Sequence, residues 1–383
     1  MTKAATLQQA LTRFLDPSGL DRQRQRVCTH LLACRTKAMG GMVLQCSDCA
    51  HVQPRYFGCR DRHCPQCQGR AMAQWAERQQ ANMLPVRYYH VVFTLPHSLN
   101  GWVQLHPEVI HRLLFQSAWQ TLCTFARDPK RLNGEMGMIA VLHTWGQNLS
   151  QHVHLHCLVP GGALSDDGKW HEARSNYLFP VRALSRHFRG HMVSALRKAS
   201  HAGDLHRVTR PGDVDAQLNT LMATDWVVFS KDCLEHTQAV VRYLARYTRQ
   251  IAISNARILA VDDQQVTLRY KDYRDHDRHK QLILDGEEFV RRFLLHVLPR
   301  GLMRVRHYGF LANRCRRQRL VQIRRALAMV DQAPHVDTAA SDAEPTYTCP
   351  HCKQPTLRMI GTLTPQRPLH DQPPNYKEQH YRA

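Results

Sequence analysis

The cysteines near the N-terminus are the residues whose spacing most clearly indicates chemistry. Of the 13 cysteines in the chain, seven lie between Cys28 and Cys67. Cys46 and Cys49 form one CxxC pair, and Cys64 and Cys67 form a second pair a short distance along the chain. Each pair offers two thiolates within one turn, and Zn²⁺ binds four such ligands in a tetrahedron. The spacing therefore predicts a structural zinc site made of these four cysteines.

The same stretch holds further candidate zinc ligands, namely Cys28, Cys34, Cys59 and His63. They form either a second, less regular zinc site or a set of free thiols, and the sequence favours neither. A third CxxC pair, at 349 and 352, is either half of a zinc site completed by other residues or a remnant. We expect the remnant.

Three histidines alternate with apolar residues in the segment QHVHLHCLVPGG. In a strand, this spacing places His152, His154 and His156 on one face. Packing alone explains such a row poorly, because each buried imidazole needs its own hydrogen-bond partner. Neutral imidazoles can instead converge on one divalent ion, held by two histidines and a third polar ligand with positions open to phosphate oxygens. The third ligand stays open between His152, Gln147, Gln151 and a polar residue on a facing helix.

A pair of tyrosines in the segment HTQAVVRYLARYTRQ forms the next candidate group. Tyr243 and Tyr247 are four residues apart and so share one helical face, with Arg246 and Arg249 close by. A phenol is a poor nucleophile at neutral pH, but guanidinium groups and a metal that polarises the electrophile can activate the attack. Packing of the two rings against a core is the competing interpretation of this spacing.

These groups must be positioned by strands and helices that the sequence also indicates. Strand patterns occur at 87–95, 137–145, 152–159, 226–230, 251–254 and 265–270, and helical periodicity occurs at 7–15, 69–84, 98–125, 183–199, 234–249, 287–298 and 313–330. The mixture predicts an α+β fold. We expect a zinc-binding domain with flanking helices over 1–84, a catalytic domain with a basic helical C-terminal part over 85–328, and a linker with a flexible tail over 329–383.

The charge balance indicates the kind of partner. The chain has 52 Lys and Arg against 31 Asp and Glu, a formal net charge of +21, and 43% hydrophobic residues. The hydrophobic content excludes a wholly disordered chain, and the excess of positive charge favours a polyanionic partner over a merely solvated basic surface. No stretch approaches the roughly 20 apolar residues of a membrane span, so a cytoplasmic protein with no membrane partner is expected. Candidate nucleic-acid contacts are Arg60, Arg62, Arg70, Arg246, Arg249, Arg316 and Arg317.

The order of these motifs resembles that of the HUH endonucleases, and within them the rolling-circle transposases of the IS91 group of insertion sequences. The resemblance covers most of residues 28–320. It rests on the segments CRDRHCPQCQG, YYHVVFTLPHSLN, WGQNLSQHVHLHCLVPGG, YLARYTRQIAISNARIL and VRHYGFLANRCRR, taken together and in this order.

The resemblance implies a central antiparallel sheet flanked by helices and preceded by a small zinc-binding domain. It implies that His154 and His156 bind Mg²⁺ or Mn²⁺ on a middle strand, although His152 with His154 also fits the motif, and that Tyr243 and Tyr247 are the nucleophiles. The implied reaction is metal-assisted transesterification of single-stranded DNA at transposon ends and target, through a 5′-phosphotyrosine. Self-association of the protein and association with the bacterial nucleoid would accompany it.

Two other functions compete with the transposase. A plasmid replication initiator or a conjugative relaxase would use the same site, but the N-terminal cysteine cluster favours the transposase. A zinc protein that binds nucleic acid without catalysis would leave the histidine row as a solvent-facing strand.

Overall fold

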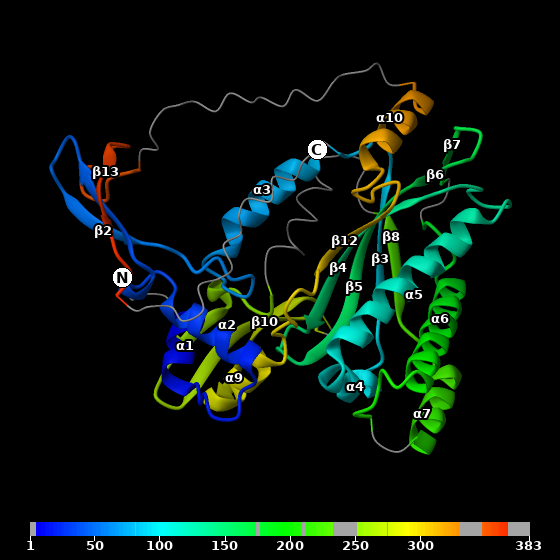
Figure 1. The fold of residues 1–383 in the computed structure, drawn as a ribbon, viewed down its shortest axis with the longest axis horizontal. Coiled ribbons are helices and arrows are strands. Elements are labelled where there is room, and N and C mark those ends of the chain that lie inside the picture. The colour runs from blue at the N-terminus through cyan, green and yellow to red at the C-terminus, as the bar shows by residue number, and fades with distance from the viewer. Residues whose placement is uncertain are drawn as a thin grey trace.

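The computed structural model describes residues 5–80, 82–173, 177–208, 211–232, 251–273, 275–328 and 347–366. Its centre is a five-stranded sheet in the order β12-β4-β5-β3-β8, in which every neighbouring pair is antiparallel (Figure 1). Strand β5, which carries the histidine row, lies in the middle. The strands are β3 (Tyr88–Thr94), β4 (Gly137–Trp145), β5 (Gln151–Pro160), β8 (Val228–Asp232) and β12 (Val305–Gly309).

Helices cover one face of this sheet (Figure 1). They are α4 (Asn100–Leu105), α5 (Pro107–Arg127), α6 (Val181–His201) and α7 (Pro211–Ala223). The buried residues of α6 recur at helical spacing, with four of them at 184, 188, 192 and 196, which gives that helix one apolar side. From that side the Phe188 ring packs 4.9 Å from the ring of Phe93 on β3 and 5.4 Å from the ring of Trp226, measured between centroids. This apolar layer holds the middle strands in place.

The opposite face of the sheet is polar at its centre, and we call it the histidine face. His143 on β4 stands directly across from His154 on β5, and Val141 stands across from His156. His90 on β3 points to the same face, because Val92, two residues further, pairs with His156. The pairing register therefore brings histidines from three neighbouring strands together.

The N-terminal module contains a second small sheet that the C-terminal segment completes. Strand β1 (Gly41–Cys46) pairs with β2 (Val52–Tyr56) on one side and with β13 (Leu357–Leu363) on the other. The predicted division at 329 needs correction here, because residues 347–366 fold with the N-terminal module rather than as a tail. The module also contains α1 (Leu7–Phe14), α2 (Arg22–Ala33), η1 (Lys37–Met39) and α3 (Gln68–Gln80).

A third layer lies beside α1 and α2 (Figure 1). Its sheet has the order β11-β10-β9, and α9 follows β11 directly. The backbone N–H of Leu7 donates to Asn255 Oδ1, and the Phe14 ring fills the space that a Cβ at Gly286 would need. The remaining elements are η2 (His97–Leu99), β6 (Gly162–Leu164), β7 (Trp170–Glu172), η3 (Asn255–Arg257), β9 (Ile258–Val261), β10 (Gln265–Asp272), β11 (Arg278–Asp285), α9 (Gly286–Leu294) and α10 (Arg316–Ala326).

The predicted fold class is confirmed: the chain is α+β, with a central antiparallel sheet and an N-terminal cysteine-rich module. Two element predictions are wrong. The helical stretch 98–125 is divided at Pro107, which cannot donate a backbone hydrogen bond and begins a new helix. Residues 251–254 form no strand, because Ala252 adopts a positive φ of 63°. No helix among the described residues is long and apolar enough to span a membrane.

Candidate functional site

The centre of the histidine face is a compact group of three imidazoles, which we call the histidine cluster. One ring nitrogen of each of His143, His154 and His156 lies within 4.8 Å of the others. The Nε2 atoms of His154 and His156 are 3.0 Å apart, and the His143 ring centroid lies 4.4 Å from that of His156. All three belong to strands β4 and β5, so the sheet itself fixes their positions.

Hydrogen bonds orient two of the rings. Nδ1 of His154 lies 2.8 Å from the carbonyl oxygen of His152, so Nδ1 carries the proton and the Nε2 lone pair is left to face the cluster. Nδ1 of His156 lies 2.8 Å from Nε2 of His90, and Nε2 of His156 faces Nε2 of His154 within the cluster. Such outer partners are what hold metal-binding imidazoles in one tautomer and orientation.

Burial keeps His154, His156 and His90 neutral. It lowers the pKa of His154 to about 3 and that of His90 to about 4, and it lowers the pKa of His156 strongly as well, with help from neighbouring His143 and His154. A neutral imidazole presents a lone pair, whereas a protonated one repels a cation. Three imidazole nitrogens this close together fit one divalent ion, with the remaining coordination positions open.

The third member of the cluster was not among the sequence candidates. Gln147 donates instead to the Tyr273 hydroxyl (3.3 Å), and the Gln151 side chain accepts from Gln104 (2.7 Å). His152 turns away towards His97, with Nδ1 and Nε2 3.4 Å apart, and is not part of the cluster. His143 takes the third position. The signal that could have found it is the predicted strand 137–145, which carries a histidine near its end.

The N-terminal module contains a cluster of four cysteines from its loops and helix ends, which we call the first cysteine cluster. Its members are Cys34, Cys59, Cys64 and Cys67. The Sγ atoms of Cys34 and Cys67 are 3.5 Å apart and those of Cys59 and Cys67 are 3.9 Å apart. Tetrahedral Zn²⁺ with bonds of about 2.3 Å places its sulfurs about 3.8 Å from one another, so these distances fit zinc. Hydrogen bonds from the other three thiols, that of Cys34 first, lower the pKa of Cys67 and favour a thiolate there.

A second cysteine cluster joins the two ends of the described chain. Cys46 and Cys49 lie with Cys349 and Cys352, at Sγ–Sγ distances of 3.6 Å (46 to 352) and 3.7 Å (49 to 349). A hydrogen bond from the Thr356 hydroxyl is the main reason that the pKa of Cys46 falls to about 6. These distances fit a second Zn²⁺ equally well.

The grouping of cysteines therefore differs from the predicted one. Cys46 and Cys49 do not share a site with Cys64 and Cys67, because β1 and β2 separate the two pairs and each pair finds its partners elsewhere. The Cys349 and Cys352 pair is no remnant, since it completes the second cluster.

Two other predicted zinc ligands lie outside both clusters. Nδ1 of His63 is 2.8 Å from Asp61 Oδ1, and its Nε2 accepts the backbone N–H of Leu298, so both ring nitrogens are used. Cys28 is buried, and burial raises the pKa of its thiol to about 11, which keeps it protonated.

Comparison with known proteins places the chain among transposases. Residues 137–319 match the family described as "Putative transposase", and residues 6–95 match the family described as "Transposase zinc-binding domain". The chain is 42% identical over 353 residues to "Putative transposase y4qJ" of Sinorhizobium fredii, covering 88% of this chain and 89% of that protein. It is 28% identical over 344 residues to "Transposase for insertion sequence element IS801" of Pseudomonas savastanoi pv. phaseolicola, covering 86% and 80%. No solved structure matches.

The chain belongs to the IS91 family of transposases.

The tyrosine pair of this transposase, Tyr243 and Tyr247, lies outside the described residues, as do Arg246 and Arg249. The predicted helix 234–249 that carries them is likewise outside. Their assignment as nucleophiles and DNA contacts rests on the sequence.

Most of the other predicted DNA contacts of the transposase lie among the described residues. Arg60 and Arg317 are exposed, and Arg316 is half-buried at the start of α10. Arg70 belongs to α3, and its side chain is outside the described set. Arg62 uses its guanidinium to hold backbone carbonyl oxygens of Leu302 (2.5 Å) and of Pro299 (2.6 Å). It fixes a loop of the catalytic domain against the zinc-binding module.

Proposed function

We propose that this transposase cleaves and rejoins single-stranded DNA by transesterification through a 5′-phosphotyrosine intermediate. The observation that supports this most directly is the histidine cluster: three imidazoles on neighbouring strands in the middle of the sheet, with one ring nitrogen of each within 4.8 Å of the others. Mg²⁺ or Mn²⁺ held by His143, His154 and His156 would polarise the scissile phosphate. His90 orients His156, and the sheet keeps the cluster rigid.

The nucleophile in this proposal is Tyr243 or Tyr247. The phenolic oxygen attacks phosphorus in line, the bond from phosphorus to the 3′ oxygen breaks, and the proton lost by the phenol is matched by the one gained at the 3′ oxygen. No water is consumed, so the phosphotyrosine keeps the bond energy needed for rejoining. A 3′-hydroxyl from another strand end can then attack the same phosphorus and release the tyrosine. Two tyrosines allow two ends of an element to be handled in one cycle.

The cysteine clusters have a structural role in this proposal. Each binds one Zn²⁺, and together they fold the module that precedes the catalytic sheet. The donor sets support zinc, since four thiolates at these separations are typical of closed structural sites with no position open for substrate.

Trapping of the covalent adduct tests the chemistry. Tyr→Phe at both 243 and 247 keeps the rings and removes the attacking oxygens, so we expect the protein to fold, to bind oligonucleotides and to form no adduct with single-stranded DNA in the presence of Mn²⁺. Each single Phe variant should keep cleavage at one end but complete little strand transfer. Adduct at the wild-type level in the double variant would exclude this nucleophile assignment. Absence of any adduct from the wild type on its own element ends would favour a non-catalytic DNA-binding protein.

A further inference from the structure

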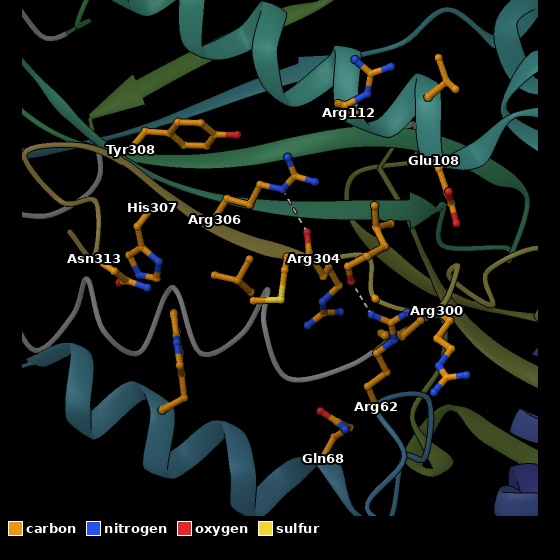
Figure 2. Close-up of a pocket in the computed structure, with 17 residues that line it drawn as sticks. Arg62, Gln68, Glu108, Arg112, Arg300, Arg304, Arg306, His307, Tyr308 and Asn313 are labelled. Atoms are coloured by element: carbon orange, nitrogen blue, oxygen red, sulfur yellow. Dashed lines mark hydrogen bonds between the residues drawn. The ribbon is translucent and has the colours of Figure 1, made fainter. Parts of the chain in front are cut away.

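A large cleft lies along the edge of the central sheet, and we call it the β12 cleft. Strand β12 is the end strand of its sheet, with β4 as its one neighbour among the described strands. The cleft beside it has a volume of about 1150 Å³ and lies between α3 of the zinc-binding module and α5 of the catalytic domain (Figure 2). A ligand bound there would touch both modules.

The lining of the cleft is strongly basic. Five arginines from three parts of the chain, at 62, 112 and 300–306, line the cleft together with one carboxylate, that of Glu108. Arg300 is exposed and makes no ion pair with any described residue. Arg306 lies over the Phe115 ring, 4.2 Å from its centroid, which presents the guanidinium on a rigid support. Burial lowers the pKa of Arg304 to about 9, so it still carries its charge at neutral pH. Such a site favours a polyanion.

Aromatic rings stand beside these charges. Trp75 lines the cleft from α3, and Tyr308 lines it from β12, where its ring stacks on that of Trp119 at 5.2 Å and 24°. Nε2 of His307 lies 3.3 Å from Gln79 Oε1, and this contact joins α3 to the sheet edge. A basic groove with flat aromatic walls is the arrangement by which proteins hold unpaired nucleotides, because the backbone meets cations while bases stack on rings.

The cleft also continues along α10. Asn313 borders both the β12 cleft and a neighbouring hollow of about 550 Å³ along α10, lined by Arg314, Arg317 and Arg325. Ile251, the first described residue after the segment that contains Tyr243 and Tyr247, also lines the cleft. The basic surface therefore extends beyond the size of a single mononucleotide.

We propose that the β12 cleft binds a stretch of single-stranded DNA, with phosphates at Arg300 and Arg306 and a base against Trp75. The proposal rests on the proposed function, in which the same strand is cleaved. A single strand suits the site better than a duplex. Proteins that bind duplex DNA insert a helix or a strand pair into its grooves, whereas here the binding surface is itself a cleft, which can enclose a single strand. Arg62 is a positioning residue in this account: it fixes the loop that carries Arg300 by binding carbonyl oxygens of that loop.

The test measures binding of a fluorescein-labelled oligo-dT to the full-length protein by anisotropy, at several salt concentrations and without added divalent ion. Arg300→Glu is the test variant, and Arg186→Glu, an equal charge change at an exposed residue of α6 that does not line the cleft, is the control. We expect Arg300→Glu to weaken binding at least fivefold and to reduce the slope of log affinity against log salt by about 1, as loss of a phosphate contact does. Arg186→Glu should match the wild type.

Photocrosslinking gives an independent readout. An oligo-dT with one 5-iododeoxyuridine should crosslink to Trp75 or Tyr308, and the adduct can be mapped by mass spectrometry. Equal affinity of the Arg300→Glu and Arg186→Glu variants, or crosslinks confined to other parts of the chain, would overturn the proposal. Neither the anisotropy measurement nor the crosslinking requires the protein to cleave DNA. If Arg300→Glu weakens oligo-dT binding but the wild-type protein forms no tyrosine adduct, the DNA-binding role of the β12 cleft stands and the proposed cleavage chemistry is rejected. If the wild-type protein forms the adduct but Arg300→Glu binds oligo-dT as the wild type does, the cleavage chemistry stands and the DNA-binding role of the cleft is rejected.

Discussion

The histidine cluster and the two cysteine clusters hold their ligands in opposite ways. His143, His154 and His156 lie on paired strands whose register is fixed by backbone hydrogen bonds and by an apolar layer on the other face of the sheet. The cysteines lie on turns, at helix ends and at strand ends, and in the second cluster they come from segments about 300 residues apart. The histidine cluster exists because the sheet is folded. In the cysteine clusters the metal itself must help to hold the surrounding chain.

This difference separates folding from function in the two regions. Substitution of a histidine of the cluster should reduce activity and leave the protein folded. Substitution of a cysteine of either cysteine cluster should unfold part of the N-terminal module. Glycine at position 58 shows how tight the module is, because a Cβ there would lie 2.8 Å from Cys67 Sγ.

The largest effect is expected for Cys64→Ser. Structural zinc in small modules contributes apparent binding free energies of about 10–16 kcal/mol, which is as large as the whole stability of a typical domain at about 5–15 kcal/mol. We expect one of two bound zinc ions to be lost and α1 to α3 to become sensitive to protease. Metal analysis and limited proteolysis would measure this. Cys28→Ser, at a buried cysteine outside both clusters, is the control and should keep both ions.

The next effect is a loss of activity without loss of fold. His143→Ala removes a proposed metal ligand, and we expect adduct formation to fall by more than the roughly 10–100-fold that loss of an outer-shell partner typically costs. The melting temperature should stay close to that of the wild type. Gln147→Ala, at the residue that the sequence offered for the same position, should retain activity. The assignment of the third ligand fails if the two variants behave in the reverse way.

A smaller and more local effect is expected for Cys349→Ser. It opens the second cysteine cluster, so β13 should detach from β1 while the first cluster and the central sheet stay folded. Proteolysis should then release a C-terminal fragment, and one zinc ion should remain. Cys123→Ser, on α5 and outside both clusters, is the matched control. Release of both ions together would show that the two clusters fold as one unit.

The sequence predicted those parts of the molecule that depend on local pattern. Strand 137–145 matches β4, and the alternation in β5 placed His154 and His156 on one face, where the structure has them. His143 was missed because its place in the cluster depends on the register between two strands, which no local pattern determines. Cys349 was misjudged for the same kind of reason, since its partners are far away in the sequence and pairing of β13 with β1 brings them together.

The smallest expected effect concerns His111, a buried histidine on α5 that packs on the other side of the central sheet. Neither ring nitrogen has a hydrogen-bond partner among the described residues, and burial, aided by the nearby Arg306 guanidinium, lowers its pKa to about 4. In the unfolded chain the pKa is about 6.5, so between pH 6.5 and 4 the unfolded state binds more protons. Stability should therefore fall as pH decreases through this window, and above pH 6.5 the residue should contribute no pH dependence.

His111→Leu should reduce this acid-side decline while leaving the pH dependence above 6.5 unchanged. Urea unfolding at pH 7 and pH 5 would measure it, with His201→Leu, at an exposed residue of α6, as the control that keeps the wild-type slope. His111→Leu should remove only part of the loss of stability at acid pH, because burial also lowers the pKa of His296 and of His307 to about 4 and these residues titrate in the same window. An acid-side slope equal to that of the wild type would mean that His111 reaches solvent or a partner before unfolding. The contrast with the histidine cluster would then weaken, because a lone buried histidine would escape the cost of burial by reaching solvent, whereas His154 in the cluster has the His152 carbonyl oxygen as its partner inside the fold.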